Sequence, residues 1–144
     1  MRKNRVNLSD SDSLRTSSNV TAGKLLRRAG RDDVVYPGHE DLPEVPLGTP
    51  DLDWMPVVSG RRLIVLTRDK RIRTRPAELA TYLEHGIRAV WIGGKHDLGP
   101  HDQMQLFLAQ EARLQREAVK LGDGPWALVM TATGVRELRL RSPN

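Results

Sequence analysis

The feature that most constrains the fold is a short apolar run inside a strongly basic stretch, Arg61–Arg75. The run Leu63–Leu66 contains β-branched residues and no polar residue, which is typical of a strand covered on both faces of a parallel sheet. Asp69 follows just past the carboxyl end of this strand. Open α/β sheets bind ligands at that edge, so this carboxylate is placed for chemistry rather than for packing.

Basic side chains surround Asp69 in the sequence, in excess of what one carboxylate can pair with. They are Arg61, Arg62, Arg68, Lys70, Arg71, Arg73 and Arg75. Arginine grips phosphate bidentately, so the stretch predicts a polyanionic partner, with phosphate contacts from Arg68, Lys70, Arg71 and Arg73. No aromatic residue is interleaved, which argues against base stacking. The alternative is an ordinary solvated charged face.

The length of 144 residues suits a single domain, and the net charge of +5 is compatible with an anionic partner. Because the chain has no cysteine, disulfides, thiolate zinc sites and a cysteine nucleophile are excluded. No apolar run approaches the ~20 residues of a membrane span, and the N-terminus lacks the apolar core of a signal peptide. We therefore expect a cytoplasmic protein without a membrane partner.

Helical and strand signals alternate along most of the chain, as in a three-layer α/β/α fold with a mainly parallel sheet and a C-terminal β-hairpin. Besides the strand already described, helices are predicted at 21–29, from Thr49-Pro50 to Gly60 with Thr49 as N-cap, at 76–84 and at 101–121. Further strands are predicted at 33–36, 87–92, 126–131 and 135–140. The Pro- and Gly-rich segment Pro37–Pro50 predicts a long surface loop.

The first nineteen residues are rich in serine and show neither strand alternation nor a helical stripe. We predict a disordered or atypical segment over residues 1–19, followed by the folded domain over 20–141. A strand before the first helix is therefore missing from the predicted sheet.

Three acids form the most promising chemical constellation. Asp51 and Asp53 fall in the first turn of the predicted second helix, and Asp69 lies at the carboxyl edge of the sheet. Carboxylates that converge from two elements suit Mg²⁺ or Mn²⁺, which could lower the pKa of a bound water for attack on a phosphodiester. Asp51 and Asp53 lie about 200° apart around a helix, so only one of them is expected to face the site.

Each acid also has a structural explanation. Asp51 and Asp53 could serve the helix dipole alone, and Asp69 could simply pair with Arg68 or Lys70. A zinc site at His96 and His101 with their neighbouring acids matches no established spacing and is not expected. Gly93-Gly94-Lys95 lacks the remaining residues of a phosphate loop.

Three segments together resemble the PIN-like domain of VapC-type toxins from bacterial toxin-antitoxin modules. They are GTPDLDWMPV (48–57), LIVLTRDKRIRTRPAEL (63–79) and GIRAVWIGG (86–94). The resemblance implies a metal-dependent endoribonuclease, a hydrolase with acids around Mg²⁺ or Mn²⁺ that cleaves RNA and is blocked by a cognate antitoxin. By motif, Asp69 corresponds to the acid after the central strand, and Asp51 or Asp53 to the acid on the preceding helix. These three residues are the expected catalytic and metal-binding set, and a homodimer is a further expectation.

The sequence also departs from that family pattern. Relatives begin with a hydrophobic strand that ends in an Asp, whereas the matching place here is near Ser17 and Ser18, and Asp10 and Asp12 lie too far upstream. Arg71 and Arg73 stand where a second acid is common. We therefore expect a weakened or inactive nuclease, with a non-catalytic RNA- or antitoxin-binding module as one alternative and an α/β protein with a small-molecule site as another.

Overall fold

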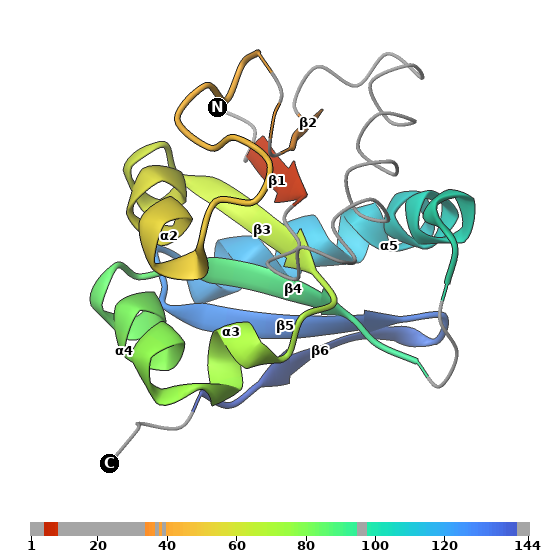
Figure 1. Cartoon of the computed structure of the whole chain (residues 1–144). Helices are drawn as coiled ribbons and strands as arrows, with labels where there is room; N and C mark the ends of the chain where they lie inside the picture. Colours follow the sequence, from red (N-terminus) through yellow and green to blue (C-terminus); the bar gives the residue numbers. More distant parts are fainter. Residues whose placement is uncertain (1–4, 9–33, 37, 39, 95–97, 141–144) are drawn as a thin grey trace.

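One sheet organises the molecule. The computed structural model describes residues 5–8, 34–36, 38, 40–94 and 98–140, and in these residues six strands pair in the order β2-β1-β3-β4-β5-β6 (Figure 1). The strands are β1 (Arg5–Leu8), β2 (Val34–Val35), β3 (Leu63–Thr67), β4 (Arg88–Ile92), β5 (Trp126–Thr131) and β6 (Gly134–Leu138). The first five are parallel, and β6 returns antiparallel to β5. The predicted mainly parallel sheet with a C-terminal hairpin is confirmed.

The strand β3 is buried along its whole length, as its apolar run predicts. Leu63 and Val65 belong to the hydrophobic cluster on one face of the sheet, and Ile64 and Leu66 belong to the cluster on the other. This alternation follows from the two-residue period of a strand. The structure thus explains why the run contains no polar residue.

Helices cover both faces, which confirms the three-layer arrangement (Figure 1). On one face lie α2 (Asp51–Gly60), α3 (Arg71–Thr74) and α4 (Pro76–Glu84). The other face is covered by the long helix α5 (Pro100–Leu121). None of the helices in the described part of the chain has the length and apolar composition that crossing a membrane requires.

The connections on either side of β4 differ in hand. The chain steps from β3 to β4 and then from β4 to β5 in the same direction along the sheet. However, α4 covers one face and α5 covers the other. Two crossovers that step the same way on opposite faces have opposite hands, so one of them departs from the usual right-handed rule. As a result, α5 covers the face of β4 and β5 that lies opposite α2 and α4.

The prediction for the N-terminal segment is wrong at Arg5–Leu8. These four residues form β1, which pairs in parallel with both β2 and β3 and therefore sits inside the sheet. A first strand is thus present. The remaining residues of 1–19, Asp10 and Asp12 among them, lie outside the described residues, as does the predicted helix at 21–29. The boundary between residues 19 and 20 stays a prediction.

Local signals set most of the element ends. Pro76 begins α4, and Gly86, with a φ of 63°, follows its end, as predicted. The prediction of Thr49 as a helix cap is wrong, because its hydroxyl donates instead to the carbonyl of Pro46 (2.6 Å), and Pro50 holds the N-cap position of α2.

The described part of the loop at 37–50 has no helix or strand, as predicted. It is nevertheless not confined to the surface. Leu42 and Val45 are fully buried and pack with Trp54 of α2 in the cluster on that face of the sheet. The loop is therefore anchored to the core by two apolar side chains.

Candidate nucleic-acid interface

Asp69 lies at the point where the order of the strands reverses. The neighbours β1 and β3 are connected in opposite directions, because the chain leads from β1 to β2 on one side and from β3 to β4 on the other. Ligands of open α/β sheets bind outside the carboxyl ends of the strands at such a point. Asp69 comes two residues after the end of β3, so its predicted location is confirmed.

Three hydrogen bonds fix the turn that follows β3. The backbone N–H of Asp69 donates to the hydroxyl of Thr67 (3.1 Å), and the backbone N–H of Arg71 donates to Oδ1 of Asp69 (2.9 Å). From the next strand, the indole N–H of Trp91 donates to the carbonyl oxygen of Asp69 (2.9 Å). Both the main chain and the side chain of Asp69 are therefore held in place.

The carboxylate of Asp69 forms a bidentate ion pair with Arg71. Nε of the guanidinium lies 2.9 Å from Oδ1, and Nη2 lies 2.7 Å from Oδ2. The side chain of Asp69 is 6% exposed, whereas that of Arg71 is 37% exposed. The pair thus buries the carboxylate and presents the guanidinium to solvent. The sequence suggested Arg68 or Lys70 as partners, and the structure shows Arg71 instead.

Arg73 is held by an aromatic ring. Its guanidinium carbon lies 5.2 Å from the ring centroid of Trp91, within the range of a cation–π contact. Trp91 in turn stacks on Tyr82, with 6.1 Å between the centroids. The Nε–H of Arg73 is buried and has no hydrogen-bond partner among the residues that the structure describes, and burial lowers the pKa of this side chain. Trp91 was not predicted as part of the site, although an indole N–H on a buried strand requires a hydrogen-bond partner.

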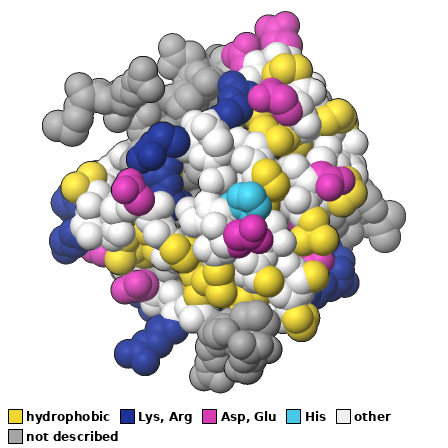
Figure 2. Space-filling view, turned by 90° about the vertical axis from the view of Figure 1, so that its left-hand side faces the viewer, with side chains coloured by type: hydrophobic (Ala, Val, Ile, Leu, Met, Phe, Trp, Pro, Cys, Tyr) yellow, Lys and Arg dark blue, Asp and Glu magenta, His cyan; other side chains and the backbone are white. Residues whose placement is uncertain are grey.

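The basic stretch is divided between two edges of the sheet. Arg61 and Arg62 precede β3 and thus lie at its amino end, away from Asp69. Arg61 pairs with Glu44 (3.3 Å) and Arg62 with Asp123 (3.1 Å). Figure 2 shows the side of the molecule that is on the left in Figure 1, where acidic, basic and hydrophobic side chains are interspersed. Arg61 and Arg62 therefore lie apart from the basic residues that follow β3.

Four of the five remaining cations of the stretch lie within six residues after β3. Nη1 of Arg68 donates to the carbonyl of Leu98, in the segment before α5 (3.4 Å), and Lys70 is exposed. Together with Arg71 and Arg73, they place four positive side chains within six residues at this edge. Guanidinium groups that are already oriented by neighbouring groups are well suited to binding phosphate oxygens.

The described acids do not fit a divalent cation as they stand. Oδ1 of Asp51 accepts a hydrogen bond from the indole N–H of Trp54 (2.9 Å), Asp53 is exposed, and Asp69 is engaged by Arg71. Within 5–8, 34–36, 38, 40–94 and 98–140, no three histidine, aspartate or glutamate side chains are grouped as a metal site requires. His96 lies outside the described residues.

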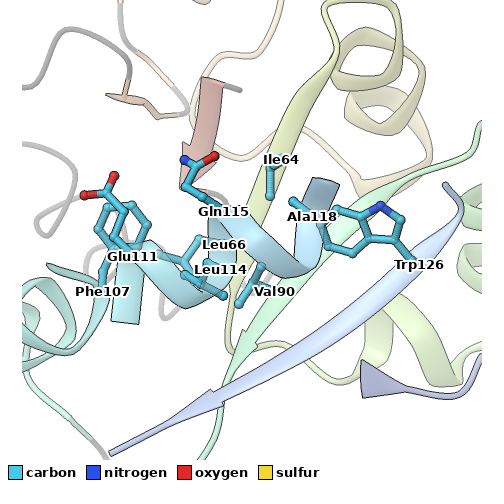
Figure 3. Close-up of a pocket in the computed structure, with 9 residues that line it drawn as sticks. All are labelled: Ile64, Leu66, Val90, Phe107, Glu111, Leu114, Gln115, Ala118 and Trp126. Carbon is cyan, nitrogen blue, oxygen red and sulfur yellow. The ribbon is translucent and has the colours of Figure 1, made fainter. Parts of the chain in front are cut away.

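A cavity lies on the other face of the sheet, between α5 and β3, β4 and β5 (Figure 3). Its walls are mostly apolar, with Phe107 and Leu114 of α5 facing Ile64 and Val90, while Glu111 and Gln115 contribute the polar groups. Its volume is about 20 Å³, enough for roughly one water molecule and far below a ligand site. We regard it as a packing defect of the core.

The fold defines an α/β protein with a mainly parallel sheet, and its site is a cluster of basic side chains at the carboxyl edge of that sheet. A model of the family described as a PIN-like domain matches residues 18–94, which is more than half of the chain, so the chain belongs to the PIN-like domain family. The match includes β3, Asp69 and all four edge cations, and it ends just after β4. A search of curated proteins and a search of solved structures each found no match.

Proposed function

We propose that this chain is an RNA-binding PIN-like module in which metal-dependent cleavage is weak or absent. The observation that carries this proposal is the bidentate ion pair between Asp69 and Arg71. In this pair Asp69, the acid at the carboxyl edge of the sheet, holds the guanidinium of Arg71 in place. The edge is then suited to holding a phosphodiester rather than to hydrolysing it.

The proposed contacts come from Arg68, Lys70, Arg71 and Arg73. These residues follow β3, next to the point where the strand order reverses. Arg71 and Arg73 are each held by a neighbouring side chain. The chemistry supports phosphate as the ligand, and the resemblance to VapC-type toxins favours RNA as its source. The base of each nucleotide would remain outside the contact, because Trp91 is 3% exposed.

Salt dependence tests the binding. Binding of a fluorescent single-stranded RNA in EDTA should weaken steeply with salt, with a log–log slope of about −0.7 per neutralised phosphate. The double variant Arg68→Ala/Lys70→Ala should have a shallower slope. Arg116→Ala/Arg139→Ala removes the same charge from exposed positions elsewhere and should leave most of the slope unchanged. Equal losses in the two double variants would show that net charge, not this edge, binds RNA.

The second candidate is a ribonuclease toxin that uses Mg²⁺ or Mn²⁺, with Asp69 and Asp51 or Asp53 as ligands and a cognate antitoxin as partner. Membership of the PIN-like family and the position of Asp69 at the switch point favour it. A ribonuclease assay with Mn²⁺ separates the two candidates. Robust cleavage that Asp69→Ala abolishes would establish a metal-dependent ribonuclease and refute a weakened site.

A further inference from the structure

We propose that the guanidinium of Arg71 takes the place of a divalent cation at Asp69, so that this chain recognises phosphate without metal. The inference rests on the proposed phosphate-binding function and adds how the site is built. It assigns Asp69 as a positioning residue that acts through Arg71.

The guanidinium of Arg71 occupies both carboxylate oxygens that a bound cation would need. The guanidinium engages both carboxylate oxygens, with separations of 2.9 Å and 2.7 Å from Nε and Nη2. A further N–H, from the backbone of Arg71, adds to the positive field at Oδ1 (2.9 Å). A metal ion would have to approach the same oxygens to about 2.0–2.6 Å, so Arg71 and a metal exclude each other there.

The two side chains of the Asp69–Arg71 pair differ in their exposure to solvent. The carboxylate is almost covered while more than a third of the Arg71 side chain faces solvent. A phosphate that arrives at this edge therefore meets the guanidinium first. A divalent cation held by Asp69 would supply positive charge to the phosphate, and here the guanidinium of Arg71 would supply that charge instead.

Arg73, the second arginine, is also linked to Asp69. Trp91 carries Arg73 on its ring and is itself tied to the carbonyl of Asp69. Arg71 and Arg73 are therefore ordered before any ligand binds. Less side-chain entropy is lost when ordered arginines engage phosphate, which favours binding without the help of a metal ion.

A metal-rescue experiment tests the inference, with a fluorescent single-stranded RNA as the probe. Wild-type affinity should be the same in EDTA and in Mn²⁺. Arg71→Gln should weaken binding about tenfold in EDTA, and Mn²⁺ should restore much of the loss because the carboxylate of Asp69 is released. Asp69→Asn/Arg71→Gln should show no such rescue. Arg75→Gln removes the same charge from an exposed neighbour and should show only a small loss, without rescue.

Three results would overturn the inference: wild-type binding that requires Mn²⁺, no rescue of Arg71→Gln, or equal rescue of the double variant. If wild type binds no RNA even at low salt, the proposed function fails instead. In that case, titration with Mn²⁺ alone, followed by electron paramagnetic resonance, still decides the inference. Arg71→Gln should bind Mn²⁺ more tightly than both wild type and the double variant. Equal affinities would refute the proposal that Arg71 takes the place of a cation at Asp69.

Discussion

The indole N–H of Trp91 donates a hydrogen bond to the backbone carbonyl of Asp69 over 2.9 Å. This bond ties the fourth strand to the turn after the third, at the edge where the parallel strands end. Trp91 is 3% exposed, so the bond is shielded from water. The turn that carries the edge arginines is therefore part of the core rather than a loose loop.

Trp91→Phe should lower the free energy of unfolding by about 1–3 kcal/mol, because a carbonyl oxygen loses its donor in a buried place. Urea denaturation followed by circular dichroism measures the change. RNA affinity should fall as well, since the smaller ring is a weaker partner for Arg73. Trp54→Phe, which removes the indole bond to Asp51, is the matched control and should leave RNA affinity unchanged. Unaltered RNA affinity in Trp91→Phe would separate the ring from the interface.

Tyr82 predicts how stability responds to high pH. Burial raises the pKa of its hydroxyl far above the ordinary value, and the hydroxyl donates to the carbonyl of Trp126 (2.5 Å). Below about pH 10 the folded and unfolded states both keep the proton, so its contribution to stability is complete. Above that pH the unfolded chain releases a proton that the folded chain retains, and stability falls by up to ~1.4 kcal/mol per pH unit.

Tyr82→Phe lacks this titration and should also lose about 1 kcal/mol at neutral pH, with the hydrogen bond. The unfolding free energies of wild type and Tyr82→Phe should therefore converge as the pH rises from 9 to 11, as measured in urea. Parallel curves over that range would mean that Tyr82 titrates alike in both states.

The sequence predicted elements whose signals are local. Pro76 and Gly86 bracket α4, and the apolar run of β3 specifies burial on both faces, so no distant contact is needed to read either. In contrast, β1 has two apolar residues, Val6 and Leu8, in a serine-rich segment. It becomes a strand by pairing with β2 and β3, which are distant in sequence. Such pairing leaves no local signal.

At the candidate site, the position of Asp69 could be predicted but its partner could not. The position follows from the end of a buried strand. The partner depends on the backbone of the turn, which brings Arg71 back over the carboxylate and leaves Lys70 exposed. The division of the basic stretch was missed for another reason. Glu44 and Asp123, which pair with Arg61 and Arg62, lie on other segments.

Two glycines near the end of α5 allow backbone strain and steric overlap to be separated. Gly122 and Gly124 have φ values of 77° and 91°, so alanine is strained at both positions. Among the described residues, a Cβ at Gly122 would meet nothing within 4 Å, whereas a Cβ at Gly124 would lie 2.6 Å from the carbonyl oxygen of Gly86. Gly124→Ala should therefore be less stable than Gly122→Ala by about 1–3 kcal/mol in thermal or urea denaturation. Equal losses of stability would show that the backbone at Gly86 moves to accommodate the added methyl group.

Asp69→Asn provides a test in which two physical effects predict opposite signs. Removing a negative charge from a surface that binds a polyanion should strengthen binding, and Asp53→Asn, at an exposed position on α2, should show that gain or no change. Asp69→Asn should instead weaken RNA binding several-fold, because Arg71 loses its bidentate anchor while the asparagine oxygen can still accept the backbone N–H of Arg71. Fluorescence anisotropy in EDTA at fixed salt measures both variants, with thermal denaturation as the check on folding. If Asp69→Asn binds RNA more tightly, to the same extent as Asp53→Asn, the carboxylate only repels phosphate and does not position the arginine.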